Sequence, residues 1–178
     1  MRTHLLVILL AVSSLSACHS SEKKKTLLPE TEAPEMTTYF LIRHAEKDRS
    51  DPENSDPELT EAGLERAKKW ATFFIKIPLD QIYSTSYKRT QQTVMDLAAD
   101  HAITVQTYDA SSLYSQDFQR LTKAKTVLVA GHSNTTPQFV NAILGTHEFT
   151  DMDDTDNSSL YMVTVVGDQK KAWVFTVE

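Results

Sequence analysis

The fold expected for this chain is decided by the stretch TYFLIRH at residues 38–44. Its first five residues are aromatic, aliphatic or β-branched, as in a buried strand, and an arginine and a histidine follow at once. A second stretch, TVLVAGH at residues 126–132, has the same form and also ends in a histidine. Ligands of α/β proteins bind at the carboxyl ends of such strands. We therefore expect His44 and His132 to meet at one edge of a sheet.

Between these stretches, STSYKRT at residues 84–90 joins a predicted strand to a predicted helix. Arg89 lies at the start of that helix, where free N–H groups attract phosphate. Together with Arg43 it supplies two guanidiniums beside two imidazoles, a set that suits a doubly charged anion such as phosphate. Ser86 and Asn134 are candidates for further hydrogen bonds to the anion, and helix capping is an equal alternative for both.

The rest of the pattern alternates strands with helices. Thr60 is a predicted N-cap of a helix that ends before Pro78, and its core-facing positions are Leu64, Ala67, Ala71 and Phe74. The other predicted elements are strands at 81–84 and 103–107, helices at 86–100 and 135–144, and a hairpin of strands 159–166 and 172–177. Trp70 and Trp173 are predicted packing residues. This order predicts a three-layer α/β/α fold whose sheet is mostly parallel with an antiparallel edge.

The N-terminus has the features of a secretory signal. Arg2 precedes an apolar run at 5–12 and small residues, which predicts a signal peptide over 1–17. The sequence LSAC at 15–18 resembles a bacterial lipobox, and Cys18 is the only cysteine. We expect lipid-anchored attachment to a membrane through Cys18, on the periplasmic or extracellular side of the bacterial envelope. An ordinary signal peptide with a coincidental cysteine is the alternative, since the run at 5–17 is too short for a retained membrane span. Residues 18–36 have the composition of a flexible tether, and 37–178 form the predicted domain.

Length and charge limit the partners. The 178 residues accommodate one α/β domain, and the formal net charge is −6. An acidic domain binds nucleic acid poorly, so no nucleic-acid partner is expected. A small phosphorylated substrate, reached through a locally positive pocket, fits this charge better.

Four motifs carry a resemblance to a known family: LIRHAE at 41–46, LTEAG at 59–63, the segment 84–93, and GHSN at 131–134. In this order they resemble the histidine phosphatase superfamily, of the phosphoglycerate-mutase-like fold, in its compact branch. The resemblance spans residues 38–177. It implies a phosphatase without metal or cofactor, in which His44 is the nucleophile and passes through a phosphohistidine intermediate. Arg43, Arg89 and His132 would form the supporting ring, and the arginines should lower the pKa of His44.

The resemblance also implies a general acid after the strand at 103–107, which indicates Asp109. Glu46 and Asp117 are rivals, and each of the three is alternatively a solvated loop charge. If Asp109 is the acid, burial beside the pocket should raise its pKa.

Other readings of the sequence remain open. DMDDT at 151–155 matches a magnesium-dependent phosphatase motif, but no strand precedes it, so a solvated acidic loop is the expectation. A zinc site at His44 and His132 lacks further ligands nearby and faces two arginines.

The polar segment 47–58 is expected near the pocket mouth, where Lys47 or Arg49 would reach substrate. A membrane-tethered phospho-ligand binder without turnover and a phosphomutase are the alternative functions.

Overall fold

The computed structural model describes residues 35–178. The predicted signal peptide, the lipidation site Cys18 and the tether up to residue 34 lie outside the described residues. Strand β1 (Met36–Arg43) begins at the residue assigned to the end of the tether. In the described part of the chain, no helix is both long and apolar enough to cross a membrane.

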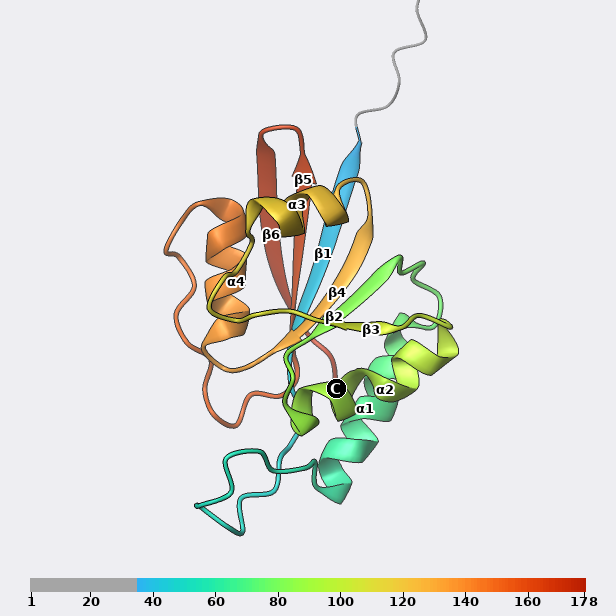
Figure 1. Ribbon diagram of the computed structural model, residues 1–178, viewed down its shortest axis with the longest axis vertical. Helices are drawn as coiled ribbons and strands as arrows, with labels where there is room; N and C mark the ends of the chain where they lie inside the picture. The colour runs from blue at the N-terminus through green and yellow to red at the C-terminus, as the bar shows by residue number, and fades with distance from the viewer. Residues whose placement is uncertain (1–34) are drawn as a thin grey trace, which may run out of the picture. The chain divides into compact units, whose positions relative to one another are not determined.

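A single mixed sheet forms the centre of the domain, in the strand order β3-β2-β4-β1-β5-β6 (Figure 1). The strands that follow β1 are β2 (Gln81–Ser84), β3 (Val105–Thr107), β4 (Thr126–Gly131), β5 (Ser159–Val166) and β6 (Gln169–Thr176). Strands β1 to β4 pair in parallel, whereas β5 and β6 add an antiparallel edge. The predicted sheet is confirmed.

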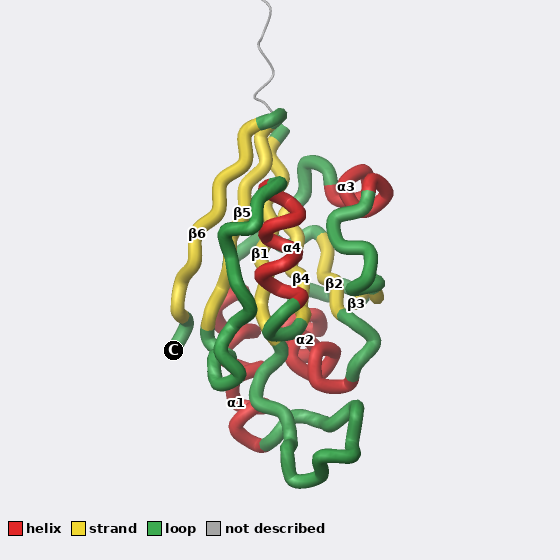
Figure 2. Tube along the Cα trace, turned by 90° about the vertical axis from the view of Figure 1, so that its left-hand side faces the viewer, coloured by secondary structure: helices red, strands yellow, loops and turns green. Residues whose placement is uncertain are grey.

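Helices cover both faces of the sheet, which gives the three predicted layers (Figures 1 and 2). They are α1 (Glu61–Phe74), α2 (Lys88–Asp100), α3 (Gln116–Thr122) and α4 (Thr135–Leu144). Phe40 and Ile42 of β1 pack with the apolar side chains of α1 and α2, and Tyr39 and Leu41 pack with those of α3 and α4. Strand β1 is therefore apolar on both sides, as a central strand between two helical layers must be.

The start of α1 is fixed against the residues that follow β1. Thr60 is its N-cap, as predicted, and its hydroxyl accepts a hydrogen bond from the Gly63 backbone at 3.1 Å. The Thr60 hydroxyl also donates to the Glu46 carbonyl at 3.2 Å. A Cβ atom at Gly63 would collide with the same Glu46 carbonyl. This close approach holds the loop after His44 in place.

Some local expectations are wrong. Leu64 is 41% exposed, although the periodicity of α1 placed it in the core. Helix α2 begins at Lys88, two residues later than expected, and α3 was not predicted. Strand β6 begins at Gln169, because the hairpin turn needs only two residues, of which Gly167 has a φ of +57°.

The two tryptophans differ in their surroundings. Trp70 of α1 is 1% exposed, so its predicted packing role is confirmed. Trp173 of β6, also predicted as a packing residue, is 41% exposed. Trp173 lies on the last strand of the sheet, which has a neighbouring strand on one side only among the described residues.

Candidate active site

The two histidines lie side by side at the carboxyl ends of neighbouring strands. In the parallel register of β1 and β4, Arg43 is opposite Gly131, so His44 and His132 leave the sheet together. Their ring centroids are 5.5 Å apart, with an angle of 65° between the ring planes. The predicted meeting of these residues is confirmed.

Three other elements fix the backbone of His44. Its N–H donates to the Gly131 carbonyl at 3.0 Å, and its carbonyl accepts from the Asn157 side chain at 2.8 Å. The next N–H, of Ala45, donates to the Thr93 hydroxyl of α2 at 2.9 Å. His44 is only 3% exposed. The imidazole is therefore held in one position before any ligand arrives.

Hydrogen bonding sets the tautomer of His44. Nδ1 lies 2.7 Å from the carbonyl oxygen of Ala45, which can only accept, so Nδ1 carries the proton. Nε2 then has a free lone pair. Burial, as the largest cause, and the charges of Arg43 and Arg89 together lower the pKa of His44 to about 3. The arginine effect that we expected from the sequence is thus present, but burial is the larger cause.

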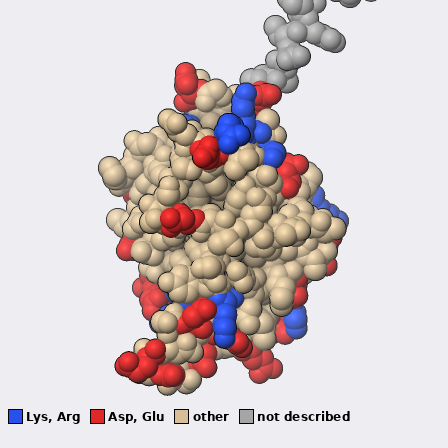
Figure 3. Space-filling view, viewed as in Figure 1, with Lys and Arg blue, Asp and Glu red and all other residues tan. Residues whose placement is uncertain are grey.

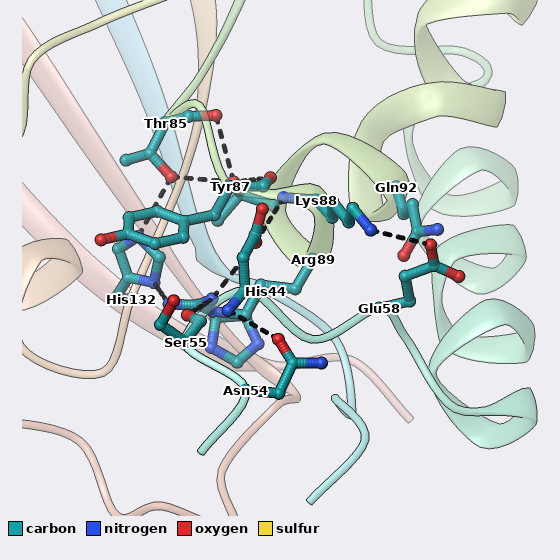
Figure 4. Close-up of polar contacts among 12 residues, drawn as sticks. His44, Asn54, Ser55, Glu58, Thr85, Tyr87, Lys88, Arg89, Gln92 and His132 are labelled. Atoms are coloured by element: carbon teal, nitrogen blue, oxygen red, sulfur yellow. Dashed lines mark hydrogen bonds and ion pairs between the residues drawn. The ribbon is translucent and has the colours of Figure 1, made fainter. Parts of the chain in front are cut away.

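His132 is also held as a neutral imidazole. A hydrogen bond of 3.0 Å joins its Nε2 to the Thr85 hydroxyl, which in turn contacts the Thr90 hydroxyl at 2.8 Å. Nδ1 lies 3.5 Å from a guanidinium nitrogen of Arg89, which can only donate. Burial lowers the pKa of His132 to about 4, and the charges of Arg89 and Arg43 contribute. Figure 4 shows the Tyr87 ring and the two imidazoles close to the Arg89 guanidinium.

Arg43 is almost completely buried and is oriented by the loop that precedes β5. It is 2% exposed. Its NH1 group donates to the carbonyls of Asp153 at 2.9 Å and Asp156 at 3.1 Å. Its NH2 group forms an ion pair of 2.6 Å with the Asp154 carboxylate, which also pairs with Arg49 at 2.7 Å. The segment 151–155 is therefore not the purely solvated loop that we expected, because it positions Arg43.

Arg89 enters the site from the first turn of α2, as predicted. Its guanidinium lies over the Tyr87 ring, 4.2 Å from the centroid, and 3.7 Å from the Asp56 carboxylate. The Nε atoms of Arg89 and Arg43 are buried and have no hydrogen-bond partner in the described part of the chain. Such donors are rare in folded proteins unless a ligand or water satisfies them. The oxygens of a bound anion would do so.

These side chains line a pocket of about 390 Å³. Its lining includes the following side chains: Arg43, His44, Lys47, Arg89, His132 and Asn134. Lys47, which we expected near the mouth, is thus part of the wall. The adjoining loop of residues 47–58 is mostly acidic among its charged side chains. In Figure 3, Asp and Glu gather at the lower end of the face, where Figure 1 draws this loop. A cationic pocket thus lies beside an acidic loop.

A second hollow of about 460 Å³ adjoins this pocket, with Tyr87 and Ala110 lining both. Ser86 is exposed and lines this second hollow rather than the first. The prediction that Ser86 binds the anion is therefore not supported by its position. Thr85, its neighbour, makes the hydrogen bond to His132 instead. Asn134 begins α4 without a side-chain capping bond, which leaves its amide available to the pocket.

None of the three predicted acids lies in the first pocket. Asp109 lines the second hollow, where it is exposed and accepts hydrogen bonds from the Ser111 backbone and hydroxyl at 2.8 Å. These bonds lower its pKa, so the expected rise is wrong. Glu46 pairs with Arg66 at 2.7 Å. Asp117 is exposed on α3 and pairs with Arg120 at 3.1 Å.

The carboxylate that does line the first pocket belongs to Asp154. Hydrogen bonds and ion pairs with Arg49 and Arg43 lower its pKa, so it is ionised at neutral pH. It orients Arg43 and cannot donate a proton in that state. Among residues 35–178, no group of three or more His, Cys, Asp or Glu is arranged to hold a metal ion.

Sequence reasoning missed the residues that support the site from a distance. Asn157 and Thr93 hold the backbone around His44, and Thr85 holds the His132 ring. Asn157 is far from His44 in the sequence and belongs to no motif that we identified. Thr85 and Thr93 lie within the segment 84–93 that we had singled out, so their position beside Arg89 was the only available signal.

The model of the histidine phosphatase superfamily (branch 1) matches residues 39–111, which include His44, Arg43 and Arg89. Over this segment the chain is similar to the histidine phosphatase superfamily. Its predicted phosphoglycerate-mutase-like fold is confirmed by similar solved structures. No curated protein sequence shows significant similarity to the chain.

Three of these structures illustrate the similarity of fold. The protein histidine phosphatase SixA, complexed with tungstate, is 18% identical, with a TM-score of 0.63 over 78% of this chain and 96% of SixA. A mycobacterial glucosyl-3-phosphoglycerate phosphatase is 13% identical, with a TM-score of 0.60 over 80% of this chain and 100% of that chain. A mutant phosphoserine phosphatase from Entamoeba histolytica, in complex with phosphoserine, is 16% identical, with a TM-score of 0.60 over 76% and 94%. All three are similar to this chain in fold, and their names give different substrates.

Proposed function

We propose that this protein is a metal-independent phosphatase that uses His44 as its nucleophile. The observation that carries the proposal is the state of the His44 imidazole, which is buried, neutral and protonated on Nδ1, at the wall of a cationic pocket. A pocket that only bound anions would gain from a charged side chain at this position. A neutral imidazole with a free lone pair instead suits attack on phosphorus.

The first step forms a bond between His44 Nε2 and phosphorus while the bond from phosphorus to the leaving group breaks. The leaving group takes the electron pair of that bond. Arg43 and Arg89 hold the phosphoryl oxygens through guanidinium donors that are already buried and oriented. The Nδ1 proton, shared with the Ala45 carbonyl, stabilises the positive charge on the phosphorylated ring. Water then attacks phosphorus, and His44 leaves as a neutral imidazole with release of inorganic phosphate.

Among the described residues, the two hollows offer the leaving group no protonated carboxyl group. The one carboxylate that lines the first pocket in the described residues, Asp154, is ionised and paired. Asp109 in the second hollow is likewise ionised. A positioned acid matters most for strongly basic leaving groups. We therefore propose phosphohistidine and aryl phosphates as better substrates than alkyl phosphates such as sugar phosphates.

The experiment compares phosphate release from a phosphohistidine peptide, an aryl phosphate and a sugar phosphate. His44→Ala should abolish release from all three, whereas His101→Ala, a histidine of the far end of α2, should leave it intact. Release should also persist in EDTA, because arginines hold the phosphoryl group that metal ions hold elsewhere. Full activity of His44→Ala would refute the nucleophile. Phosphate binding without turnover would favour the tethered binding protein, and phosphoryl transfer between substrates would favour the phosphomutase.

We also propose that Cys18 anchors the domain to a membrane of the bacterial envelope. Support comes from the lipobox-like sequence at 15–18 and the single cysteine of the chain. Two or more acyl chains give stable anchoring, which one chain does not. Cys18→Ser should move the protein from the membrane to the soluble fraction of a bacterial lysate. Unchanged membrane retention would contradict lipidation at this residue.

A further inference from the structure

Strand β6, at the edge of the sheet, has exposed apolar side chains on both of its faces that catalysis does not use. Trp173, Val174 and Phe175 are adjacent and are 41%, 48% and 45% exposed. Strand β6 is the last strand of the sheet, and among residues 35–178 no segment pairs with its outer side. Figure 2 shows β6 as the outermost strand beside β5. Proteins normally protect such an edge, because it can pair with another strand.

The two ends of the sheet differ in this respect. At the opposite end, β3 has only three residues, so it offers little backbone for pairing. Strand β6 has eight residues, and its ladder continues beyond Thr176, where the Val177 N–H donates to the Ser158 carbonyl at 2.9 Å. An edge of this length with large apolar side chains is either covered by a partner or prone to aggregation.

The hydrogen bonds to β5 show which backbone groups of β6 are free. In an antiparallel pair, alternate residues direct both N–H and C=O toward the neighbouring strand. Because Val177 bonds inward, Phe175 and Trp173 do so as well, opposite Leu160 and Met162. The N–H and C=O groups of the intervening residues therefore face outward. These residues are Lys170, Ala172, Val174 and Thr176.

We propose that a second copy of this chain pairs with β6 in an antiparallel arrangement about a two-fold axis at Val174. When a residue on the axis lies opposite its own copy, every outward-facing residue of one strand lies opposite an outward-facing residue of the other. The free N–H and C=O groups of the two strands can then form a hydrogen-bonded ladder. In this register Val174 faces Val174, and Trp173 faces Phe175 of the second copy. Aromatic cross-strand pairs of this kind stabilise sheets. The symmetry produces the Trp173–Phe175 pair twice and the Val174 pair once.

The charged residues at the ends of the paired segment favour the same register. With the axis at Val174, Lys170 lies opposite Glu178 of the second copy, so both ends of the paired segment join opposite charges. With the axis one residue earlier, at Trp173, Asp168 would oppose Glu178 and Phe175 would oppose Lys171 instead of an aromatic residue. The two sheets would thus join into one continuous sheet, with the exposed aromatic side chains covered at its centre.

This arrangement leaves both active sites free. His44 lies at the carboxyl ends of the central strands β1 and β4, whereas the proposed contact uses the edge strand. Dimer formation and catalysis are therefore separable in an experiment. Failure of the phosphatase proposal would not affect the dimer, and the reverse also holds.

The first test is cross-linking of the full chain in the membranes of the cells that produce it. Val174→Cys, treated with a short bis-maleimide, should give a covalent homodimer, because the two side chains face each other across the axis. Met95→Cys is the matched control, since Met95 is 57% exposed on α2 at the other side of the domain. It should remain monomeric, as should the original chain with Cys18 alone. Cross-linking of Val174→Cys only to a different protein, or equal cross-linking of Met95→Cys, would overturn the proposal.

A charge exchange tests the register. Lys170→Glu should weaken the dimer at least about tenfold, because it places carboxylates opposite each other at both ends. Glu178→Lys should weaken it similarly, and the two changes together should restore the original affinity. The dimer fraction is measured by sedimentation of the detergent-solubilised full chain over a range of concentrations. A double variant as weak as either single variant, or an original chain that stays monomeric throughout, would overturn the proposal.

Discussion

Lowering the pH tests the electrostatics of the site directly. A histidine of ordinary pKa, about 6.5, is only about 3% neutral at pH 5. With its pKa lowered to about 3, His44 should be about 99% neutral at the same pH, by the same relation. The nucleophile should therefore keep its lone pair in mildly acidic solution.

Histidine-labelled protein allows this to be measured by NMR between pH 3 and pH 8. The signal of His44 is assigned by its loss in His44→Gln, and the titration midpoint is read from its chemical shift. Arg89→Met should raise the pKa of His44 but leave it below the ordinary value, because burial is the largest cause of the shift and remains. A midpoint near 6.5 in the original protein would refute the reasoning about burial.

The same pKa shift makes stability depend on pH. The pKa of His44 is lower in the folded chain than in the unfolded chain. As pH falls below about 6.5, His44 therefore becomes protonated in the unfolded chain while it stays neutral in the folded chain. The contribution of His44 to stability should therefore be complete above that pH. It should decrease as pH falls toward 3, by about 1.4 kcal/mol per pH unit within this window. Urea unfolding at several pH values measures this slope, with His44→Gln as the comparison.

Three substitutions test other parts of the structure. Asn157→Ala should lower the free energy of unfolding by about 1–3 kcal/mol, because it leaves the buried His44 carbonyl without its hydrogen-bond donor. Urea unfolding measures this change, and an unchanged free energy of unfolding would contradict the anchoring role of Asn157. Asp109→Asn should leave the rate of phosphate release within about twofold and the alkaline limb of its pH–rate profile unchanged, because this carboxylate is ionised and lies outside the first pocket. A general acid would contribute a factor of about 10²–10⁴ to the rate, so a large loss would restore Asp109 as the acid. Gly63→Ala should cost about 1–3 kcal/mol of stability, because its Cβ collides with the Glu46 carbonyl, and a neutral result in thermal unfolding would mean that α1 can shift.

The sequence by itself determined the sheet and the chemical groups of the site. Strands β1 and β4 are recognisable because each contains a continuous run of apolar residues, which is a local pattern. Their histidines meet because neighbouring parallel strands end at the same edge. Arg89 was placed correctly by the helix that begins beside it. Helix α3 was missed because seven residues span too few turns to show a periodic pattern.

Only the tertiary structure decided which groups support the chemistry and which stay outside it. Asn157 and Asp154 reach His44 and Arg43 across more than a hundred residues, a separation over which no local pattern carries information. The state of each carboxylate follows from its surroundings in space, so Asp109 is ionised by hydrogen bonds within its own loop and Asp154 by two arginines. Trp173 was predicted to be a packing residue because its residue type is apolar. It is exposed because burial depends on which element covers a strand, and β6 is the edge.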